Sequence, residues 1–217
     1  MDTQDATDDQ SSFNFKIILA SASPRRKELL EKAGVKFNVV VCEVDETLED
    51  ELLAKPEEAA KKLAEKKAGA VIQHILACEK PESTIVIGSD TMVVFEGEIF
   101  GKPHNLSDAT RMLTKLSGKT HEVITAVSLW MVSVDNDGKV NLGFRSFAEQ
   151  AKVRFKQLDA QTIADYLREG ESFDKAGAYA AQGKGAALIE DIEGDKDTVI
   201  GLPISKLIEE FPDLVAS

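Results

Sequence analysis

The spacing of apolar residues along this chain follows two periods, which together predict a protein of mixed α/β class. Apolar and β-branched runs predict strands at residues 16–20, 37–44, 84–88, 92–95, 98–100, 123–134, 140–155 and 187–192. Apolar residues three and four positions apart predict amphipathic helices at residues 24–33, 56–75, 107–116 and 159–168, and a last helix from Pro203. The order of these elements favours an α/β fold with a long twisted mixed sheet, flanking helices and two lobes around a cleft.

Local signals place several of the element boundaries. Ser23 is a predicted N-cap with Pro24 at the first helical position, and Gly34 ends that helix. Ser107 and Asp159 are predicted caps of two later helices. The segment Asp135, Asn136, Asp137 and Gly138 predicts a tight turn between the two longest strands.

Length and composition limit the architecture and the partners. A chain of 217 residues that is 43% hydrophobic can form one packed domain, which we expect over residues 15–217. Residues 1–14 are polar and acidic and are expected to be a disordered tail. The net charge of −12 repels nucleic-acid backbones and anionic lipid, so neither nucleic acid nor a membrane is an expected partner.

The cysteines and the hydropathy predict a cytoplasmic location. Cys42 and Cys78 lie far apart without a metal-binding or redox spacing, which favours free buried thiols in a reducing compartment. No apolar run approaches the length that spans a membrane, and the N-terminus lacks the features of a signal peptide.

The segment from Leu19 to Arg26 carries the first candidate chemistry. A buried strand ends there and a helix begins, so unpaired backbone N–H groups and the helix dipole favour an anion. Arg25 and Arg26 add planar guanidinium groups that match phosphate oxygens, and Ser21 adds a hydroxyl. The alternative is an ordinary helix start with solvated arginines.

Asp90 is the sharpest single candidate. It follows the apolar run 84–88, and a carboxylate at the end of a buried strand points into the crevice where α/β proteins bind ligands. There it can hold a divalent cation or orient a water molecule. The alternative is a turn aspartate that caps a backbone N–H group. Lys102, between Gly101 and Pro103, lies on a narrow loop that restricts its direction.

The residue types favour phosphoryl chemistry assisted by a metal ion. Carboxylates occur with arginines and lysines, and no nucleophile–histidine pair is evident. The glycine-rich loop of P-loop NTPases is absent, and so is the fingerprint of dinucleotide-binding folds.

The ordered set of short motifs resembles the Maf family of nucleoside triphosphate pyrophosphatases. The resemblance extends from about Lys16 to Phe211, and its combination of motifs is specific even where single motifs are not. The matching segments are 19–26, 45–46, 88–91, 101–103, 116–118, 120–121, 175–179, 182–183 and 201–203. The resemblance implies a fold similar to that of inosine triphosphate pyrophosphatase, and it implies a homodimer.

The resemblance also implies a reaction and a set of roles. The reaction is hydrolysis of dTTP and UTP to the nucleoside monophosphate and pyrophosphate, dependent on Mg²⁺ or Mn²⁺. The implied catalytic residues are Asp90, Lys67 and Lys102, the implied metal ligands are Glu46 and Asp90, and the implied substrate-binding residues are Ser21, Arg25, Arg26, Thr91 and Gln182.

Three of these positions carry the implied base preference, because relatives that act on 7-methyl-GTP have tryptophan, glutamine and glutamate where this chain has Arg25, Thr91 and Gln182. A glutamine amide both donates and accepts, which suits the edge of uracil or thymine. Tryptophan stacks on a cationic methylated purine, whereas arginine repels it.

Two other functions stay open at this stage. One is a nucleotide-binding regulator of cell division with little catalysis, and the other is the same reaction on a different nucleotide such as 7-methyl-GTP. The segment 194–198 also departs from the usual family pattern, which has aromatic residues after the glycine.

Overall fold

A single mixed sheet of seven strands organises the part of the chain that the computed structural model describes, residues 15–77, 82–135 and 137–215. Its order is β2-β1-β3-β5-β6-β7, and β4 pairs with β3 outside this row. Strand β1 is parallel to β2 and β3, and the remaining pairs are antiparallel. The strands are β1 (Lys16–Leu19), β2 (Asn38–Val39), β3 (Thr84–Phe95), β4 (Glu98–Phe100), β5 (Thr120–Val134), β6 (Val140–Phe155) and β7 (Ile189–Glu193).

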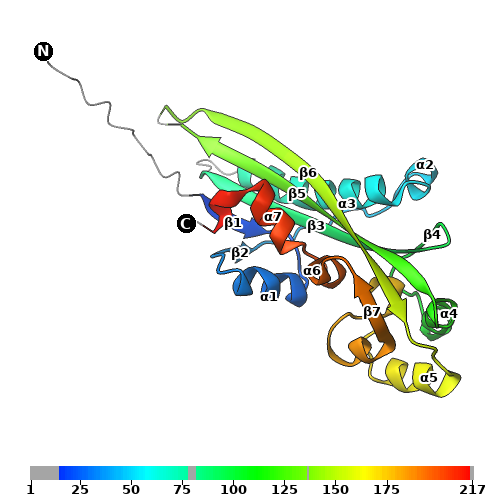
Figure 1. Cartoon of the computed structure of the whole chain (residues 1–217). Helices are drawn as coiled ribbons and strands as arrows, with labels where there is room; N and C mark the ends of the chain where they lie inside the picture. Colours follow the sequence, from blue (N-terminus) through cyan, green and yellow to red (C-terminus); the bar gives the residue numbers. More distant parts are fainter. Residues whose placement is uncertain (1–14, 78–81, 136, 216–217) are drawn as a thin grey trace, which may run out of the picture.

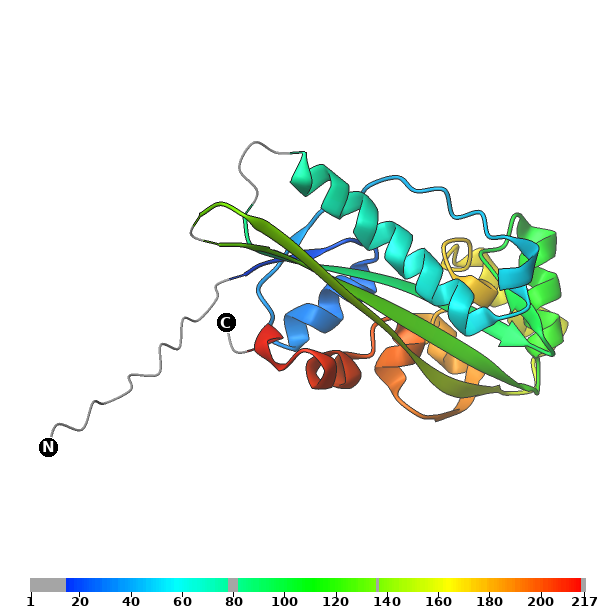
Figure 2. The same cartoon turned by 90° about the horizontal axis from the view of Figure 1, so that it is seen from above.

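Helices flank the sheet, as predicted, and they cover both of its faces. Helix α3 lies along one face, and α1 and α7 lie on the other (Figure 2). Helices α4 and α5 pack at one end of the long strands (Figure 1). The α-helices are α1 (Pro24–Lys32), α2 (Asp50–Leu53), α3 (Pro56–Leu76), α4 (Leu106–Leu116), α5 (Ala160–Arg168), α6 (Lys196–Ile200) and α7 (Ile204–Glu210). Short 3₁₀ segments are η1 (Ala176–Ala178), η2 (Gly183–Leu188) and η3 (Pro212–Leu214).

The central strand β3 contributes to a different core on each side of the sheet. Ile85 and Ile87 pack with the apolar residues of α1 and α7, while Val86 packs against α3. The two-residue period of an extended strand produces this division, because successive side chains point to opposite faces.

A strand was expected at residues 84–88, and the prediction that it ends at Gly88 is wrong. Strand β3 continues through Asp90 to Phe95, and every residue from Thr84 to Val94 pairs with β5. The long antiparallel partner supplies backbone hydrogen bonds that keep the polar residues extended. Asp90 therefore lies in the middle of a strand, and the alternative of a turn aspartate is also excluded.

Other boundaries also differ from the predicted ones. Strand β2 covers only two residues of the predicted run 37–44. Helix α4 is capped by the side chain of Asn105, which accepts a hydrogen bond from the Asp108 backbone, and not by Ser107. Helices α2 and α6 were not predicted, because four and five residues are too few to show a helical period.

Several local predictions are confirmed. Ser23 occupies the N-cap position before Pro24, although its side chain makes no capping bond. Asp159 caps α5 through a bond from the Thr162 backbone. Cys42 is a free, partly buried thiol. Residues 1–14, Cys78 and Asn136 lie outside the described residues, and no helix in the described part is both long and apolar enough to cross a membrane.

Gly88 allows β3 to approach α3 closely. A Cβ atom built at this glycine would lie 2.4 Å from the Ala64 carbonyl oxygen and 2.8 Å from the Ala68 Cβ. Both neighbours are on α3, and Ala64 and Ala68 are themselves fully buried. The absence of a side chain at Gly88 therefore sets the distance between the helix and the strand that carries Asp90.

We expect Gly88→Ala to lower the free energy of unfolding by about 1–3 kcal/mol, because the added methyl group must displace helix backbone. Urea denaturation followed by circular dichroism measures this change. Gly69→Ala on α3 is the matched control, since its nearest neighbour is a Trp130 ring carbon at 4.0 Å. The control should be neutral or stabilising by up to ~1 kcal/mol. Equal stability of Gly88→Ala and the natural protein would contradict the packing argument.

Candidate active site

A cavity of about 870 Å³ collects most of the side chains that the sequence singled out. Its walls come from the turn after β1, α1, the loop after β2, α3, β3, the loop after β4, the segment around η1, and α6. Eight of the predicted site residues line it: Ser21, Arg25, Arg26, Glu46, Lys67, Asp90, Thr91 and Lys102. Gln182 is not among the lining residues, although its neighbour Ala181 is.

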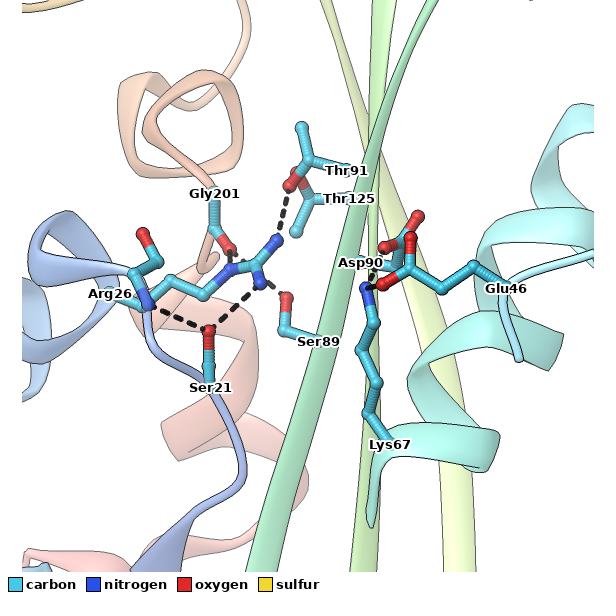
Figure 3. A network of polar contacts seen from close by, with 10 residues as sticks. Ser21, Arg26, Glu46, Lys67, Ser89, Asp90, Thr91, Thr125 and Gly201 are labelled. Atoms are coloured by element: carbon cyan, nitrogen blue, oxygen red, sulfur yellow. Dashed lines mark hydrogen bonds and ion pairs between the residues drawn. The ribbon is translucent and has the colours of Figure 1, made fainter. Parts of the chain in front are cut away.

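Strand β3 sends its polar side chains to two different clusters. Asp90 points toward α3, where it meets Lys67, whereas Ser89 and Thr91 point toward α1 and Gly201 (Figure 3). This follows from the alternation that also divides the core residues of the same strand. One extended segment thereby supplies both halves of the site.

Lys67 joins two carboxylates. Its Nζ lies 2.5 Å from Asp90 Oδ1 and 3.1 Å from Glu46 Oε1 (Figure 3). Asp90 is buried, while Glu46 is exposed on the loop between β2 and α2. The ammonium offsets part of the repulsion between the two carboxylates. Glu46 on the loop and Asp90 on β3 can therefore both contact Lys67 on α3.

Arg26 is held at all three guanidinium nitrogens. Its Nε donates to the Gly201 carbonyl at 2.8 Å, Nη1 to Ser21 Oγ at 3.1 Å, and Nη2 to Thr91 Oγ1 at 3.0 Å (Figure 3). These acceptors come from three segments that are distant in sequence. Arg26 is therefore not a solvated arginine at a helix start, and its planar fork has a fixed direction in the cavity wall.

Burial lowers the pKa of Arg26 below its ordinary value, and the Asp90 carboxylate opposes that change.

The Gly201 carbonyl, which accepts from Arg26, accepts a second bond from Ser89 Oγ at 3.0 Å. Gly201 adopts φ +126°, and an added Cβ would lie 3.4 Å from Arg26 Nε and 3.3 Å from Thr91 Oγ1. A glycine at this position thus lets a carbonyl face the guanidinium at close range.

Arg25 and Lys102, two other predicted cations of the cavity, are less enclosed by the protein than Arg26. Arg25 is partly buried, and desolvation lowers its pKa while the Asp174 carboxylate opposes the change. Lys102 is exposed at the rim of the cavity on the loop between β4 and α4. These positions leave both side chains able to contact a ligand.

A second ion pair lies in the cavity wall, and neither of its residues is among the predicted site residues. The Lys175 ammonium contacts the carboxylate of its neighbour Asp174, and the Lys175 side chain is only 11% exposed. Both residues line the cavity. Their place directly before and at the start of the motif 175–179 was the available signal, but the pattern alone does not show which way the lysine points.

Two tyrosines fix the part of the wall that follows this ion pair. Tyr179 Oη lies 2.7 Å from His121 Nε2, and Tyr166 Oη accepts a bond from the Ala180 backbone N–H at 3.2 Å. Burial lowers the pKa of His121 to about 4, so the imidazole is neutral at pH 7. His121 thus acts as a buried packing partner of Tyr179 and Phe155, whose rings meet it edge to face.

The cavity wall combines a group that can bind anions, Arg26, with the Asp90 carboxylate, which is paired with Lys67. In the described residues, no group of three or more acidic, histidine or cysteine side chains could hold a metal ion. Glu46 and Asp90 are therefore a set of two carboxylates. Such a set fits Mg²⁺, which commonly binds one or two carboxylates and takes further oxygens from water and from substrate phosphates.

The amino-acid sequence is similar to a family profile and to individual bacterial proteins. A family profile described as Maf-like protein matches residues 16–214. Proteins named dTTP/UTP pyrophosphatase from Bacillus anthracis and Bacillus cereus are each 45% identical over 196 residues, which cover 90% of this chain and 94% of each relative.

Two solved structures align with the fold at lower similarity. A nucleoside-triphosphatase, or dITP/XTP pyrophosphatase, from Mycobacterium abscessus aligns with TM-score 0.40 and 14% identity, covering 92% of this chain and 94% of that one. The Ham1 protein of Staphylococcus aureus aligns with TM-score 0.39 and 13% identity, covering 80% and 79%. The profile match and the identity to the two Bacillus proteins together show that the chain belongs to the Maf family.

Proposed function

We propose that this protein hydrolyses dTTP and UTP between the α and β phosphates and releases the nucleoside monophosphate and pyrophosphate. The names of the Bacillus relatives support the substrates. The observation that carries the proposal is the pair formed by Asp90 and Lys67 in a cavity that Arg26 also lines. A carboxylate beside fixed cations is the arrangement that water attack on a phosphoanhydride needs.

Asp90 orients and deprotonates the attacking water in this proposal. Its Oδ1 is occupied by the Lys67 ammonium at 2.5 Å, so Oδ2 is the oxygen that can accept the proton. The ammonium also holds the carboxylate in one direction. Asp90 thus acts as a general base whose geometry is fixed by a helix on the neighbouring layer.

The phosphate chain binds to the cations and hydroxyl around the cavity. Arg26 has five N–H donors, of which three are used inside the protein, so two remain for phosphate oxygens. Ser21 Oγ accepts bonds from the Ser23 backbone and from Arg26, which leaves its own hydrogen to donate to a phosphate. Lys67 and Lys102 add charge, and Lys102 reaches the ligand from the rim.

A divalent cation, Mg²⁺ or Mn²⁺, belongs to this proposal. Glu46 and Asp90 would hold it together with phosphate oxygens of the substrate. The Asp90 carboxylate has about four lone-pair sites, so it could ligate the cation as well as accept from Lys67 and from the attacking water. When bound, the cation neutralises charge on the triphosphate and makes the bound water more acidic. The side chains of Glu46 and Asp90 already converge on one positive charge, that of Lys67.

Arg25, Thr91 and Gln182 select the pyrimidine base in this proposal. Arg25 and Thr91 line the cavity, and Gln182 follows its wall residue Ala181. The amide of Gln182 can pair with both the ring N–H and a carbonyl of uracil or thymine. Its partly buried position makes a lost hydrogen bond costly.

We also propose a homodimer, which the family resemblance implies, and a cytoplasmic location, which the cysteine pattern and the hydropathy favour. Strand β6 pairs with β7 only near its end, over Lys152 to Phe155. Residues 140–151 pair with β5 on one edge, and their other edge, the one that continues toward β7, has no strand partner among the described residues. An unpaired edge can accept a strand of a second copy.

Asp90→Asn should lower kcat by at least ~10²-fold, because loss of a general base commonly costs this much. Steady-state release of pyrophosphate from UTP measures the change, and circular dichroism checks the fold. Asp165→Asn on the exposed surface of α5 is the control and should keep normal turnover. A folded Asp90→Asn variant with near-normal kcat would exclude Asp90 as the base.

Removal of divalent cations should abolish turnover, because the triphosphate otherwise approaches Glu46 and Asp90 without neutralisation. The same assay in excess EDTA should show negligible activity, and Mg²⁺ or Mn²⁺ added beyond the chelator should restore it. Full activity in EDTA would contradict the assignment of Glu46 and Asp90 as metal ligands.

Gln182→Glu should lower kcat/KM for UTP and dTTP by about 5- to 150-fold, since it replaces a donor to a base carbonyl with a repelling carboxylate. The loss should be smaller for GTP, whose N1–H and amino group donate to a carboxylate. Combining the change with Arg25→Trp should favour 7-methyl-GTP by stacking. An equal loss on all four nucleotides would show that Gln182 does not read the base.

A further inference from the structure

We infer that Thr125 is a positioning residue that fixes the direction of Arg26 through the hydroxyl of Thr91. Thr125 lies on β5 and is fully buried. It is not among the residues that line the cavity, so any effect on the reaction must pass through another residue. The inference rests on the proposed function, in which Arg26 holds the phosphate chain.

The directions of the hydrogen bonds in this network can be assigned from the number of available hydrogens. Thr125 Oγ1 lies 2.6 Å from the Thr198 carbonyl oxygen, which can only accept, so the hydroxyl hydrogen of Thr125 is used there. Thr125 Oγ1 also lies 3.0 Å from Thr91 Oγ1. Thr91 must therefore be the donor in that contact, and Thr125 the acceptor.

Thr91 donates one hydrogen bond and accepts another. Its only hydroxyl hydrogen points to Thr125, and its oxygen presents lone pairs to Arg26 Nη2, which donates at 3.0 Å. The three hydrogen bonds therefore all point the same way, from Arg26 through Thr91 and Thr125 to the Thr198 carbonyl. A threonine hydroxyl rotates freely unless such partners hold it.

This row of hydrogen bonds connects Arg26 to α6. The Thr198 carbonyl belongs to α6, whose N-terminus is capped by Asp195 through bonds from the Asp197 and Thr198 backbones. Gly201 directly follows α6 and accepts from Arg26 Nε. Thr125 therefore anchors α6 to the sheet and orients the Thr91 acceptor, and both effects act on the same guanidinium.

Removal of the Thr125 hydroxyl should release Thr91 Oγ1 to rotate. Its hydrogen then loses the Thr125 acceptor, so the side chain can leave the rotamer in which its oxygen accepts from Arg26 Nη2. Arg26 keeps its bonds to Ser21 and Gly201. The expected result is a misdirected Arg26 rather than a lost one, with kcat/KM for UTP reduced roughly tenfold, the effect of one buried hydrogen bond.

The test compares Thr125→Val, which keeps the shape and removes the hydroxyl, with Thr125→Ser, which keeps the hydroxyl. Thr125→Ser should restore kcat/KM to within about threefold of the natural protein. Thr84→Val is the matched control, because Thr84 is also buried on the sheet and donates to the Glu82 carbonyl at 2.8 Å. It should leave kcat/KM unchanged, since Thr84 does not line the cavity.

A double-mutant cycle with Arg26→Ala separates positioning from general destabilisation. If Thr125 acts through Arg26, Thr125→Val should change kcat/KM less than twofold in the Arg26→Ala background. A loss of equal size in both backgrounds, or no loss in the Thr125→Val single variant, would overturn the inference. If Thr125→Val does not fold, Thr125→Ala enters the same cycle, because it places no methyl group against the Thr198 carbonyl.

The dissociation constant for inorganic pyrophosphate, measured by calorimetry on the same variants, gives a readout that needs no turnover. It should weaken roughly tenfold in Thr125→Val and should show the same dependence on Arg26. If the natural protein does not hydrolyse UTP or dTTP, the proposed function fails. The calorimetric cycle then still decides whether Thr125 positions Arg26.

Discussion

The extended conformation of β3 is the constraint on which the site depends. Its period of two residues sends Asp90 toward Lys67 on one face and sends Ser89 and Thr91 toward Arg26 and Gly201 on the other. A turn or a bulge at this position would change the face of every later side chain. The long antiparallel pairing with β5 prevents this, because it keeps the polar residues in register from Thr84 to Val94. Gly88 then lets α3 approach closely enough for Lys67 to reach the strand.

Arg26 ties together segments that are far apart in the sequence. A buried guanidinium is costly unless its donors are satisfied, and here each of its three nitrogens has a partner in the protein. The partners lie in the turn after β1, on β3 and directly after α6, so the cavity wall is closed around this side chain. The unusual segment 194–198 takes part in this closure, since it forms most of α6, and α6 brings Val199 and Ile200 to the cavity.

The cavity also resolves an electrostatic conflict in the composition. A protein of net charge −12 repels polyanions at a distance, yet its cavity gathers Arg25, Arg26, Lys67, Lys102 and Lys175. Several of these cations face carboxylates of the same cavity, as Lys67 faces Asp90 and Lys175 contacts Asp174. Such pairing keeps the charges fixed and partly neutralised before a ligand binds, so binding requires little rearrangement of the protein. Local arrangement, and not net charge, decides whether an anion is attracted.

Periodicity, caps and short motifs are local properties, so the amino-acid order was enough to predict the class of fold, most of the long elements and eight of the residues that line the cavity. It also identified the family resemblance that the profile match then showed. It did not determine where β3 ends, since Asp90 and its polar neighbours look like a turn until the pairing with β5 is known. Three features depend on the folded arrangement: Arg26 has a partner at each guanidinium nitrogen, Lys175 lies in the cavity wall, and Thr125 contacts Thr91. Apart from the bond between Arg26 and Ser21, which are five positions apart, those contacts join residues 34 to 175 positions apart or depend on which way a side chain points, and no local pattern in the chain records either.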